Sequence, residues 1–531
     1  MNTDHLLAQL ARPACFPHAP AAVHLVQTHL SIVCLADDRV YKLKKAVTLP
    51  FVDFATLSAR RQACRDEVRL NRRLCPDTYL GTASLRPGAD GALRFAAIGD
   101  DEGHDDVDVA VVMRRLPQAR MLDELLREHA VTRAEIVALA RHVAAFHART
   151  ATVPAAIAAA TPEALASFAA ANFAEILASA SHGLPMALLH ALRAATIADF
   201  AAILPELQAR ARRGLIVDGH GDLHARNVCM TEPPTVYDCI EFEPRFRIGD
   251  VATENAFLVM DLRYRGAPEL AAAYVEAYVA ASADRAQVRL LPTLCSYRAM
   301  VRTKVALLAA AESTLPAADR AAAHHSAWRH LMLAAAYVAE VRGPFWLVVC
   351  GPPASGKSRL CEQLAAVGHW PHEATDRVRK ALAGLAATAP ARAEHYTAAF
   401  SAATYGELRR RAGEHTRQGQ PMVLLDGNFP TPAHRADALA AARAAGARLV
   451  VVYVGIDVAI ATARAAARAH EPGNISDATP AVAARLAADF VAPNEREGLD
   501  VLAVDGMRPS ADLAADVMSH LLTRAPKSAT A

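Results

Sequence analysis

The residue pattern that most clearly indicates chemistry is a glycine-rich run in the C-terminal half. Residues 351–358 read GPPASGKS and fit the pattern G-x-x-x-x-G-K-[ST]. A strand-like segment, FWLVVC, precedes this run, and a helical segment, RLCEQLAAV, follows it. In such a loop the backbone amides and the lysine hold phosphates, and the hydroxyl binds Mg²⁺. The pattern therefore predicts a nucleotide site, with Lys357 also acting on the transferred phosphoryl group, formed by Gly351, Pro352, Pro353, Ala354, Ser355, Gly356, Lys357 and Ser358.

Other charged residues of this half suit the same chemistry. The apolar segment MVLLD ends at Asp426, a candidate for holding Mg²⁺ opposite Ser358. Arg464 and Arg468 share one helix face and either close over a transferring phosphoryl group or are ordinary surface arginines. A further charged run either holds a small acceptor or forms a capped, solvated helix: Asp376, Arg379 and Lys380.

In the N-terminal half the segment VDGHGDLHARNV places Asp222 five residues before Asn227. Protein kinases use H-R-D-x-x-x-x-N at this spacing, where the Asp takes the proton of the substrate hydroxyl and the Asn holds a metal. We therefore expect Asp222 to be a catalytic base and Asn227 to be a catalytic, metal-binding residue.

A strand-like segment, TVYDCIEF, follows and offers two carboxylates for the Mg²⁺ ligand of a kinase. Asp238 fits the rule that this ligand comes directly after a strand, whereas Glu241 fits the distance to the later Gly249-Asp250 pair. Both residues remain candidates from sequence alone.

The segment RVYKLKKAV is strand-like, so Lys42 and Lys44 point to the same face of the strand. Either lysine could contact the α- and β-phosphates of a nucleotide. Glu67, in the helical segment RDEVRLNRRL, is the candidate to orient that lysine through an ion pair.

The elements that must position these residues change character along the chain. Strand-like segments with one helix, about residues 56–74, occupy residues 22–113 and predict a small sheet. Helical periodicity then continues to about residue 341, interrupted by a strand–loop–strand segment around residues 214–243. From residue 345 short apolar strands alternate with helices, which is typical of a parallel sheet. We expect two domains, residues 1–341 and residues 344–531.

The composition limits the functional classes. The chain has 531 residues, and 57 Lys and Arg against 55 Asp and Glu give a net charge of +2. A nearly neutral chain argues against nucleic acid or an anionic membrane as the main partner. The nine cysteines lack a C-x-x-C pair, and no apolar stretch reaches about 18 residues. We therefore expect a cytoplasmic protein that does not span a membrane.

Several of these segments together resemble known families. The C-terminal half resembles P-loop small-molecule kinases of the gluconate kinase and polynucleotide kinase type, with an AAA-type ATP-binding domain, through GPPASGKS, the D-x-x-R-K run and the R-x-x-x-R pair. The N-terminal half resembles the aminoglycoside phosphotransferase-like family, in particular bacterial proteins that fuse such a domain to a P-loop kinase. The segments that carry this resemblance are THLS at residues 28–31, VYKLKK, EVRLNRRL, VVMRRLP, GHGDLHARN, YDCIEF, GDVATENAFLVMDL and YRAMVR.

This resemblance implies an α+β bilobal protein kinase-like domain followed by an α/β P-loop domain with a parallel sheet. The first hairpin lacks the glycine-rich loop of protein kinases, as is general in the family, so residues 28–31 would have to cover the nucleotide. The implied activity is transfer of the γ-phosphoryl group of ATP, with Mg²⁺, to a hydroxyl or amine of a small molecule. Two alternatives stay open: a catalytically silent kinase-like module controlled by a P-loop switch, and a nucleic-acid end kinase.

Overall fold

The computed structural model describes residues 3–49, 52–150, 161–178, 183–386, 389, 391–468, 486 and 488–524. Its backbone divides into two compact units: unit 1 comprises residues 1–167 and 203–294, and unit 2 comprises residues 168–202 and 295–531. The helical segment from residue 295 to residue 342 therefore groups with the C-terminal sheet. The sequence-based division into domains of residues 1–341 and 344–531 stays a prediction.

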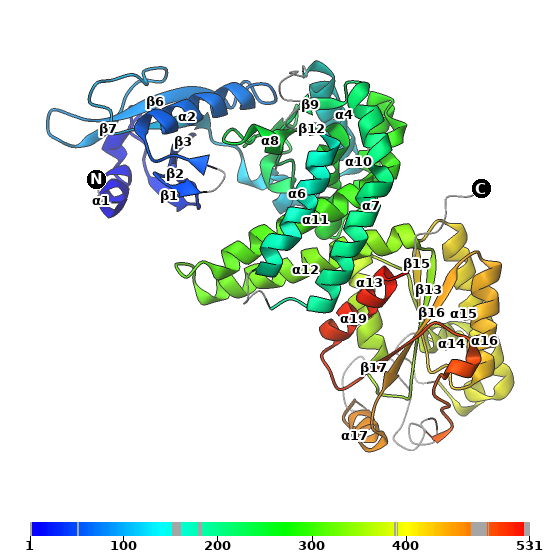
Figure 1. Ribbon diagram of the computed structural model, residues 1–531. Coiled ribbons are helices and arrows are strands. Elements are labelled where there is room, and N and C mark those ends of the chain that lie inside the picture. The colour runs from blue at the N-terminus through cyan, green and yellow to red at the C-terminus, as the bar shows by residue number, and fades with distance from the viewer. Residues whose placement is uncertain are drawn as a thin grey trace. The chain divides into compact units, whose positions relative to one another are not determined.

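Unit 1 begins with a six-stranded antiparallel sheet in the order β1-β2-β3-β8-β6-β7. Apolar side chains line both faces of this sheet, so each face needs a cover. The N-terminal helix packs against one face and the next helix against the other (Figure 1). The strands are β1 (Val23–Gln27), β2 (Ser31–Ala36), β3 (Arg39–Lys44), β6 (Tyr79–Pro87), β7 (Leu93–Phe95) and β8 (Asp108–Arg114), beside the short pair β4 (Thr48–Leu49) and β5 (Val52–Asp53).

Helix α2 (Leu57–Asn71) is the helix expected within the small sheet. The side chain of Thr56 caps it by accepting a hydrogen bond from the amide of Ala59 at 3.1 Å. Its apolar face packs on β6 and β8, and this contact fixes the position of Glu67 over the sheet. The helices before it are α1 (Thr3–Leu10) and the 3₁₀ helix η1 (Pro13–Cys15).

The rest of unit 1 is helical around a strand–loop–strand core, as the periodicity predicts. Strand β9 pairs with β12, and β10 pairs with β11, so that the connecting loop is held at both ends. The helices are η2 (Gln118–Arg120), α3 (Leu122–Arg127), α4 (Arg133–Arg149), η3 (Ala225–Asn227), α8 (Pro244–Arg247), α9 (Val251–Tyr264), α10 (Pro268–Ser282) and η4 (Arg285–Arg289). The strands are β9 (Ile216–Asp218), β10 (Val228–Cys229), β11 (Thr235–Val236) and β12 (Ile248–Asp250).

Two helices, α6 (Pro162–Ala178) and α7 (Met186–Arg212), have residues in both units. Among the described residues α7 is the one helix long and apolar enough to cross a membrane by length and composition. Its leucines at positions 188, 189 and 192 are fully buried, and its Asp199 and Arg210 form buried ion pairs. Core helices of globular proteins pass the same test.

Unit 2 contains a five-stranded parallel sheet in the order β14-β15-β13-β16-β17. The central strand β13 (Phe345–Cys350) is buried throughout, as expected for a strand covered on both faces. Helices α13 and α19 lie on one side of the sheet and α15 and α16 on the other (Figure 1). The other strands are β14 (His372–Ala374), β15 (Met422–Asp426), β16 (Arg448–Gly455) and β17 (Val501–Asp505).

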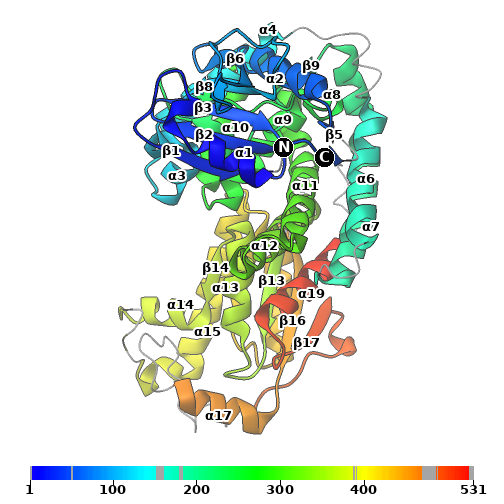
Figure 2. The same cartoon turned by 90° about the vertical axis from the view of Figure 1, so that its left-hand side faces the viewer.

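Some helices of unit 2 precede the sheet in sequence. Helix α12 runs beside α13 and α19 (Figure 2) and ends three residues before β13 begins. The helices, of which α11 starts within unit 1, are α11 (Leu291–Ala311), α12 (Ala317–Arg342), α13 (Lys357–Gly368), α14 (Thr375–Leu382), η5 (Ala393–Tyr396), α15 (Ala398–Arg417), α16 (Pro432–Ala444), α17 (Val458–Arg468), η6 (Glu495–Glu497) and α19 (Ser510–Leu522).

Candidate active sites

The loop between β9 and β10 of unit 1 brings Asp222 and Asn227 together. The Asn227 amide nitrogen donates to the backbone oxygen of Asp222 at 3.0 Å and to its carboxylate at 3.1 Å. The His224 ring nitrogen Nε2 lies 3.3 Å from the same carboxylate. The structure thus joins the two residues that the five-residue spacing predicts as partners.

Two acidic residues of α9 accept hydrogen bonds from the backbone of this loop. The Glu254 carboxylate accepts a hydrogen bond from the His220 amide at 2.8 Å, and the Asp261 carboxylate accepts one from the Ala225 amide at 2.9 Å. A Cβ atom at Gly219 would lie 1.9 Å from a Glu254 oxygen, so only glycine lets this carboxylate approach the loop. The loop therefore depends on an element that begins more than 20 residues later.

An ion network, buried except at Asp238, joins the small sheet to the loop after β11. Lys42 donates to Glu67 at 2.9 Å and to Asp238 at 2.5 Å. Lys44 donates to the other Glu67 oxygen and to Glu241. Both lysines therefore point to one face of β3, as the strand period predicts, and both contact the same glutamate of α2.

Asp238 and Glu241 differ in their surroundings. The Asp238 side chain is 43% exposed and the Glu241 side chain only 5% exposed. Burial acts to raise the pKa of Asp238, but Lys42 and Lys44 lower it below its usual value, with an opposing contribution from the nearby Asp222. Burial raises the pKa of Glu241 despite Lys44. Asp238 thus lies open and near the loop between β9 and β10, residues 219–227, which we call the catalytic loop after its predicted role. Glu241 lies deeper beside Lys44.

The prediction that both carboxylates lie on one long strand is wrong. Strand β11 covers only Thr235–Val236, and Asp238 has a left-handed backbone with φ of 63°. A residue with this conformation cannot continue a strand. The turn sends the chain back toward the catalytic loop, where the Ile240 amide donates to the His220 oxygen at 3.1 Å.

The segment expected to cover the nucleotide is the tight connection between β1 and β2. The Ser31 amide donates to the Thr28 hydroxyl oxygen, and the Thr28 amide donates to the Ser31 oxygen, both at 2.9 Å. Lys45 also donates to the Thr28 oxygen at 2.7 Å. These bonds close the hairpin without glycine.

In unit 2 the glycine-rich run connects β13 to α13 as a loop. Gly351 and Gly356 have φ values of 146° and 101°, and Ala354 has a φ of 61°. A Cβ atom at Gly351 would lie 2.4 Å from the Val454 oxygen, so this position requires glycine. The Lys357 ammonium donates to the Pro352 oxygen at 2.6 Å and therefore lies folded back over the loop.

Asp426 lies at the carboxyl end of β15, next to β13 in the sheet. Burial acts to raise the pKa of Asp426, but hydrogen bonds from His372 and Ser358 and the charge of Lys357 lower it below its usual value. The carboxylate is therefore ionised beside the Ser358 hydroxyl. This is the arrangement expected for a pair that holds Mg²⁺.

Arg464 lies on α17, and its guanidinium donates to the Gly506 oxygen at 3.0 Å. Gly506 adjoins the glycine-rich loop of residues 351–358, which we call the phosphate loop after its predicted role, because a Cβ atom at Gly506 would lie 2.4 Å from the Ser355 oxygen. The side chain of Arg468 and most of the segment that follows lie outside the described residues.

The acceptor candidates of unit 2 lie on α14. Arg379 and Lys380 are buried, which differs from the interpretation of this run as a solvated helix face. The Arg379 guanidinium donates to the His395 oxygen at 2.7 Å and stacks over Tyr396 with its centre 4.6 Å from the ring centroid.

Comparisons with known proteins match both units. A family model described as "Phosphotransferase enzyme family" matches residues 38–291, and one described as "AAA domain" matches residues 347–493. Uncharacterized proteins of Mycobacterium tuberculosis and Mycobacterium bovis are each 31% identical over 470 residues, which cover 87% of this chain and 89% of each relative. The chain belongs to the bacterial family that fuses an aminoglycoside phosphotransferase-like domain to a P-loop kinase domain.

Solved structures also match parts of this fused-kinase family member. The GDP complex of an aminoglycoside 2′-phosphotransferase is 13% identical, with a TM-score of 0.39, and covers 62% of this chain and 99% of that chain. A gluconokinase from Sinorhizobium meliloti is 18% identical, with a TM-score of 0.25, and covers 34% of this chain and 94% of that chain.

The fused-kinase chain also contains site residues that sequence motifs did not single out. Glu254 and Asp261 support the catalytic loop, and His372 donates to Asp426. The first two lie in a segment that supports the family resemblance, GDVATENAFLVMDL, so that signal was present without a role attached. His372 lies outside any recognised motif.

Proposed function

We propose that the protein is an ATP-dependent phosphotransferase with two nucleotide-binding modules, each transferring a γ-phosphoryl group to a hydroxyl or amine of a small molecule. Its family membership supports phosphotransfer in general. The observation that carries the proposal is the position of Lys42 between Glu67 and Asp238, because protein kinases pair their phosphate-contacting lysine with a glutamate and place a metal-binding aspartate nearby.

The donor groups of unit 1 fit Mg²⁺, which prefers oxygen ligands. The open Asp238 carboxylate and the Asn227 amide oxygen would hold the ion, and Mg²⁺ supplies neutralisation of the triphosphate charge. With Asp238 holding the ion, Lys42 would be available to the phosphates and would keep its bond to Glu67. We therefore propose the metal role for Asp238 and the phosphate role for Lys42. Lys44, which also contacts Glu241, would then have the structural role of holding the second Glu67 oxygen.

Asp222 would act as the general base of unit 1. It orients the acceptor and takes its hydroxyl proton as the acceptor oxygen bonds to the γ-phosphorus. The bond from that phosphorus to the bridging oxygen breaks, and ADP leaves. Asn227 and His224 position the Asp222 carboxylate through the contacts described above.

In unit 2 the backbone amides of residues 351–358 and Lys357 would hold the phosphates, and Ser358 with Asp426 would hold Mg²⁺. Arg464, placed beside the loop through Gly506, is the candidate for stabilising charge on the transferring group. Asp376 is the candidate for orienting the acceptor. A small acceptor suits both modules better than a nucleic acid, given the net charge of +2.

A metabolite screen with γ-labelled ATP tests this proposal on the full chain. Wild type is compared with Asp222→Ala, with Lys357→Ala and with the double variant. We expect each single variant to lose a different set of labelled products and the double variant to lose all of them. Glu269→Gln, an exposed position on α10, is the matched control and keeps both sets. If Asp222→Ala leaves every product intact, unit 1 is a silent module and the proposal is wrong for it.

A further inference from the structure

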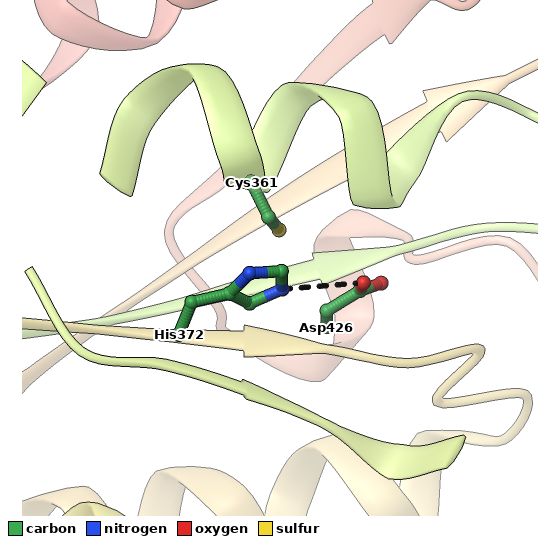
Figure 3. Close-up of side chains that lie close together, drawn as sticks. All are labelled: Cys361, His372 and Asp426. Atoms are coloured by element: carbon green, nitrogen blue, oxygen red, sulfur yellow. Dashed lines mark hydrogen bonds and ion pairs between the residues drawn. The ribbon is translucent and has the colours of Figure 1, made fainter. Parts of the chain in front are cut away.

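Three side chains of unit 2 point toward one another (Figure 3). The proposed phosphotransfer reaction uses one of them, Asp426, but does not need the three as a set. Cys361 comes from α13, His372 from β14 and Asp426 from β15. Their ligand atoms all lie within 4.8 Å of one another, and His372 Nε2 is 3.3 Å from the Asp426 carboxylate. The side chains of His372 and Asp426 are 9% and 6% exposed, and Cys361 is fully buried.

The chemistry of this set differs from that of a magnesium site. Mg²⁺ takes oxygen ligands, whereas a thiolate and an imidazole select zinc and related transition metals. Sites with three protein ligands and one open position are common for zinc. Ligand atoms around zinc lie roughly 3.3–3.8 Å apart, so side-chain movements of about 1 Å would complete the geometry.

We propose that Cys361, His372 and Asp426 form a site for a thiophilic divalent cation of the zinc class. The fourth position is open to water. The three ligands lie on α13, at the start of β14 and at the carboxyl end of β15, so the metal would tie α13 to the sheet.

One contact in the structure opposes metal binding. Arg377, an exposed residue, donates to His372 Nδ1 at 3.0 Å. Because a guanidinium only donates, Nδ1 accepts, and the ring proton of neutral His372 lies on Nε2, the atom that faces Asp426. A metal on Nε2 needs the proton on Nδ1 instead, so Arg377 must turn away first. The metal-free state is therefore stabilised by Arg377.

A second consequence rests on the proposed function of unit 2. Asp426 is there the carboxylate that holds Mg²⁺ together with Ser358, and the zinc-class site uses the same carboxylate. The two cations therefore compete for Asp426. Zinc would weaken the binding of magnesium nucleotide to the phosphate loop, and Cys361 would confer this sensitivity.

Titration of the full chain with Co²⁺ tests the site without any phosphotransfer assay. A thiolate ligand gives Co²⁺ a near-ultraviolet charge-transfer band, and tetrahedral geometry gives visible bands. We expect one bound Co²⁺ per chain with both features in the wild-type protein. Cys361→Ser is expected to abolish the charge-transfer band, and His372→Gln to weaken Co²⁺ affinity by more than the 10–100-fold typical of an outer-shell partner.

Two further variants sharpen this test. Cys295→Ser removes another buried cysteine of unit 2 and is expected to leave the cobalt spectrum unchanged. Arg377→Gln is expected to raise Co²⁺ affinity about 10-fold, because it removes the donor that opposes the metal-binding tautomer. Circular dichroism confirms that each variant is folded. A wild-type protein without the charge-transfer band, or a folded Cys361→Ser protein that keeps it, overturns the assignment.

Competition is measured separately, as the affinity for magnesium-ATP at a buffered free Zn²⁺ concentration. We expect zinc to weaken nucleotide binding in the wild-type protein and not in Cys361→Ser. If the cobalt bands appear but the loop binds no nucleotide, the proposed function fails while the metal site stands. If nucleotide binds equally well with and without zinc, the competition is refuted.

Discussion

At the residue scale, the two lysines of β3 have different surroundings, so we expect substitution of one to lower activity and substitution of the other to lower stability. Lys42 is partly exposed and contacts Asp238, so Lys42→Ala should lower phosphotransfer by unit 1 about 10²–10³-fold, as loss of one charge-stabilising donor does. Lys44 is buried between Glu67 and Glu241, so Lys44→Met should lower the free energy of unfolding by about 3–5 kcal/mol.

Denaturant unfolding and steady-state kinetics on the full chain distinguish these two outcomes. The double variant Lys44→Met/Glu241→Leu should recover much of the lost stability, because it removes the unpaired carboxylate. If Lys42→Ala is the less stable protein and Lys44→Met the less active one, the two roles are reversed.

Glu254 gives the molecule a pH dependence at acid values. Burial acts to raise the pKa of Glu254, but His147, with Nε2 3.3 Å away, and the backbone of His220 lower it to about 2. An unfolded glutamate titrates near 4.5, so the unfolded state binds more protons between these two values. The stability from Glu254 is therefore present above pH 4.5 and is lost as the pH falls toward 2.

The variant Glu254→Gln tests this dependence, since glutamine keeps an acceptor for the His220 amide. We expect it to remove about 3 kcal/mol of pH-dependent stability, seen as a flatter decline in the free energy of unfolding between pH 4.5 and 2. Glu269→Gln on the surface of α10 should leave the slope unchanged. An unchanged slope in Glu254→Gln contradicts the assignment.

At the scale of elements, Arg210 at the end of α7 connects two later segments of unit 1. It donates to Asp250, which caps α9 through the Ala252 amide, and to Asp284 before η4. Arg210→Met would leave two buried carboxylates without their partner and should cost about 3–5 kcal/mol of stability. Arg213→Met, three residues later and exposed, is the matched control, and thermal unfolding compares the two.

Sequence patterns predicted the elements with a strong local signature. The phosphate loop, the pair Asp222 and Asn227, and the shared face of Lys42 and Lys44 depend on spacing within one element or loop, and spacing is visible in sequence. The strand expected through Asp238 was wrong because a single left-handed residue ended it, and side-chain type does not show that turn. Glu254 and His372 act across elements, which spacing along the chain cannot show.

At the scale of the whole molecule, the proposal of two nucleotide-binding modules implies two bound nucleotides per chain. Calorimetry with magnesium and a non-hydrolysable ATP analogue should give a stoichiometry of two for the wild-type protein. Lys357→Ala should reduce it to one, because only unit 2 loses its phosphate-binding lysine, whereas Glu269→Gln should leave it at two. A stoichiometry of one for the wild-type protein contradicts the two-module proposal.

Helix α12 has a consequence for how such a fusion arises. It ends at Arg342, directly before β13, yet it packs on α13 and α19, and its Glu340 accepts the indole hydrogen of Trp370 at 2.8 Å. A gene breakpoint between α12 and β13 would therefore expose the surface of α13 and α19 that α12 buries, and exposed apolar surface favours aggregation. We therefore expect a folded C-terminal unit to include this helix, and so to be longer than residues 347–493, which the family model matches.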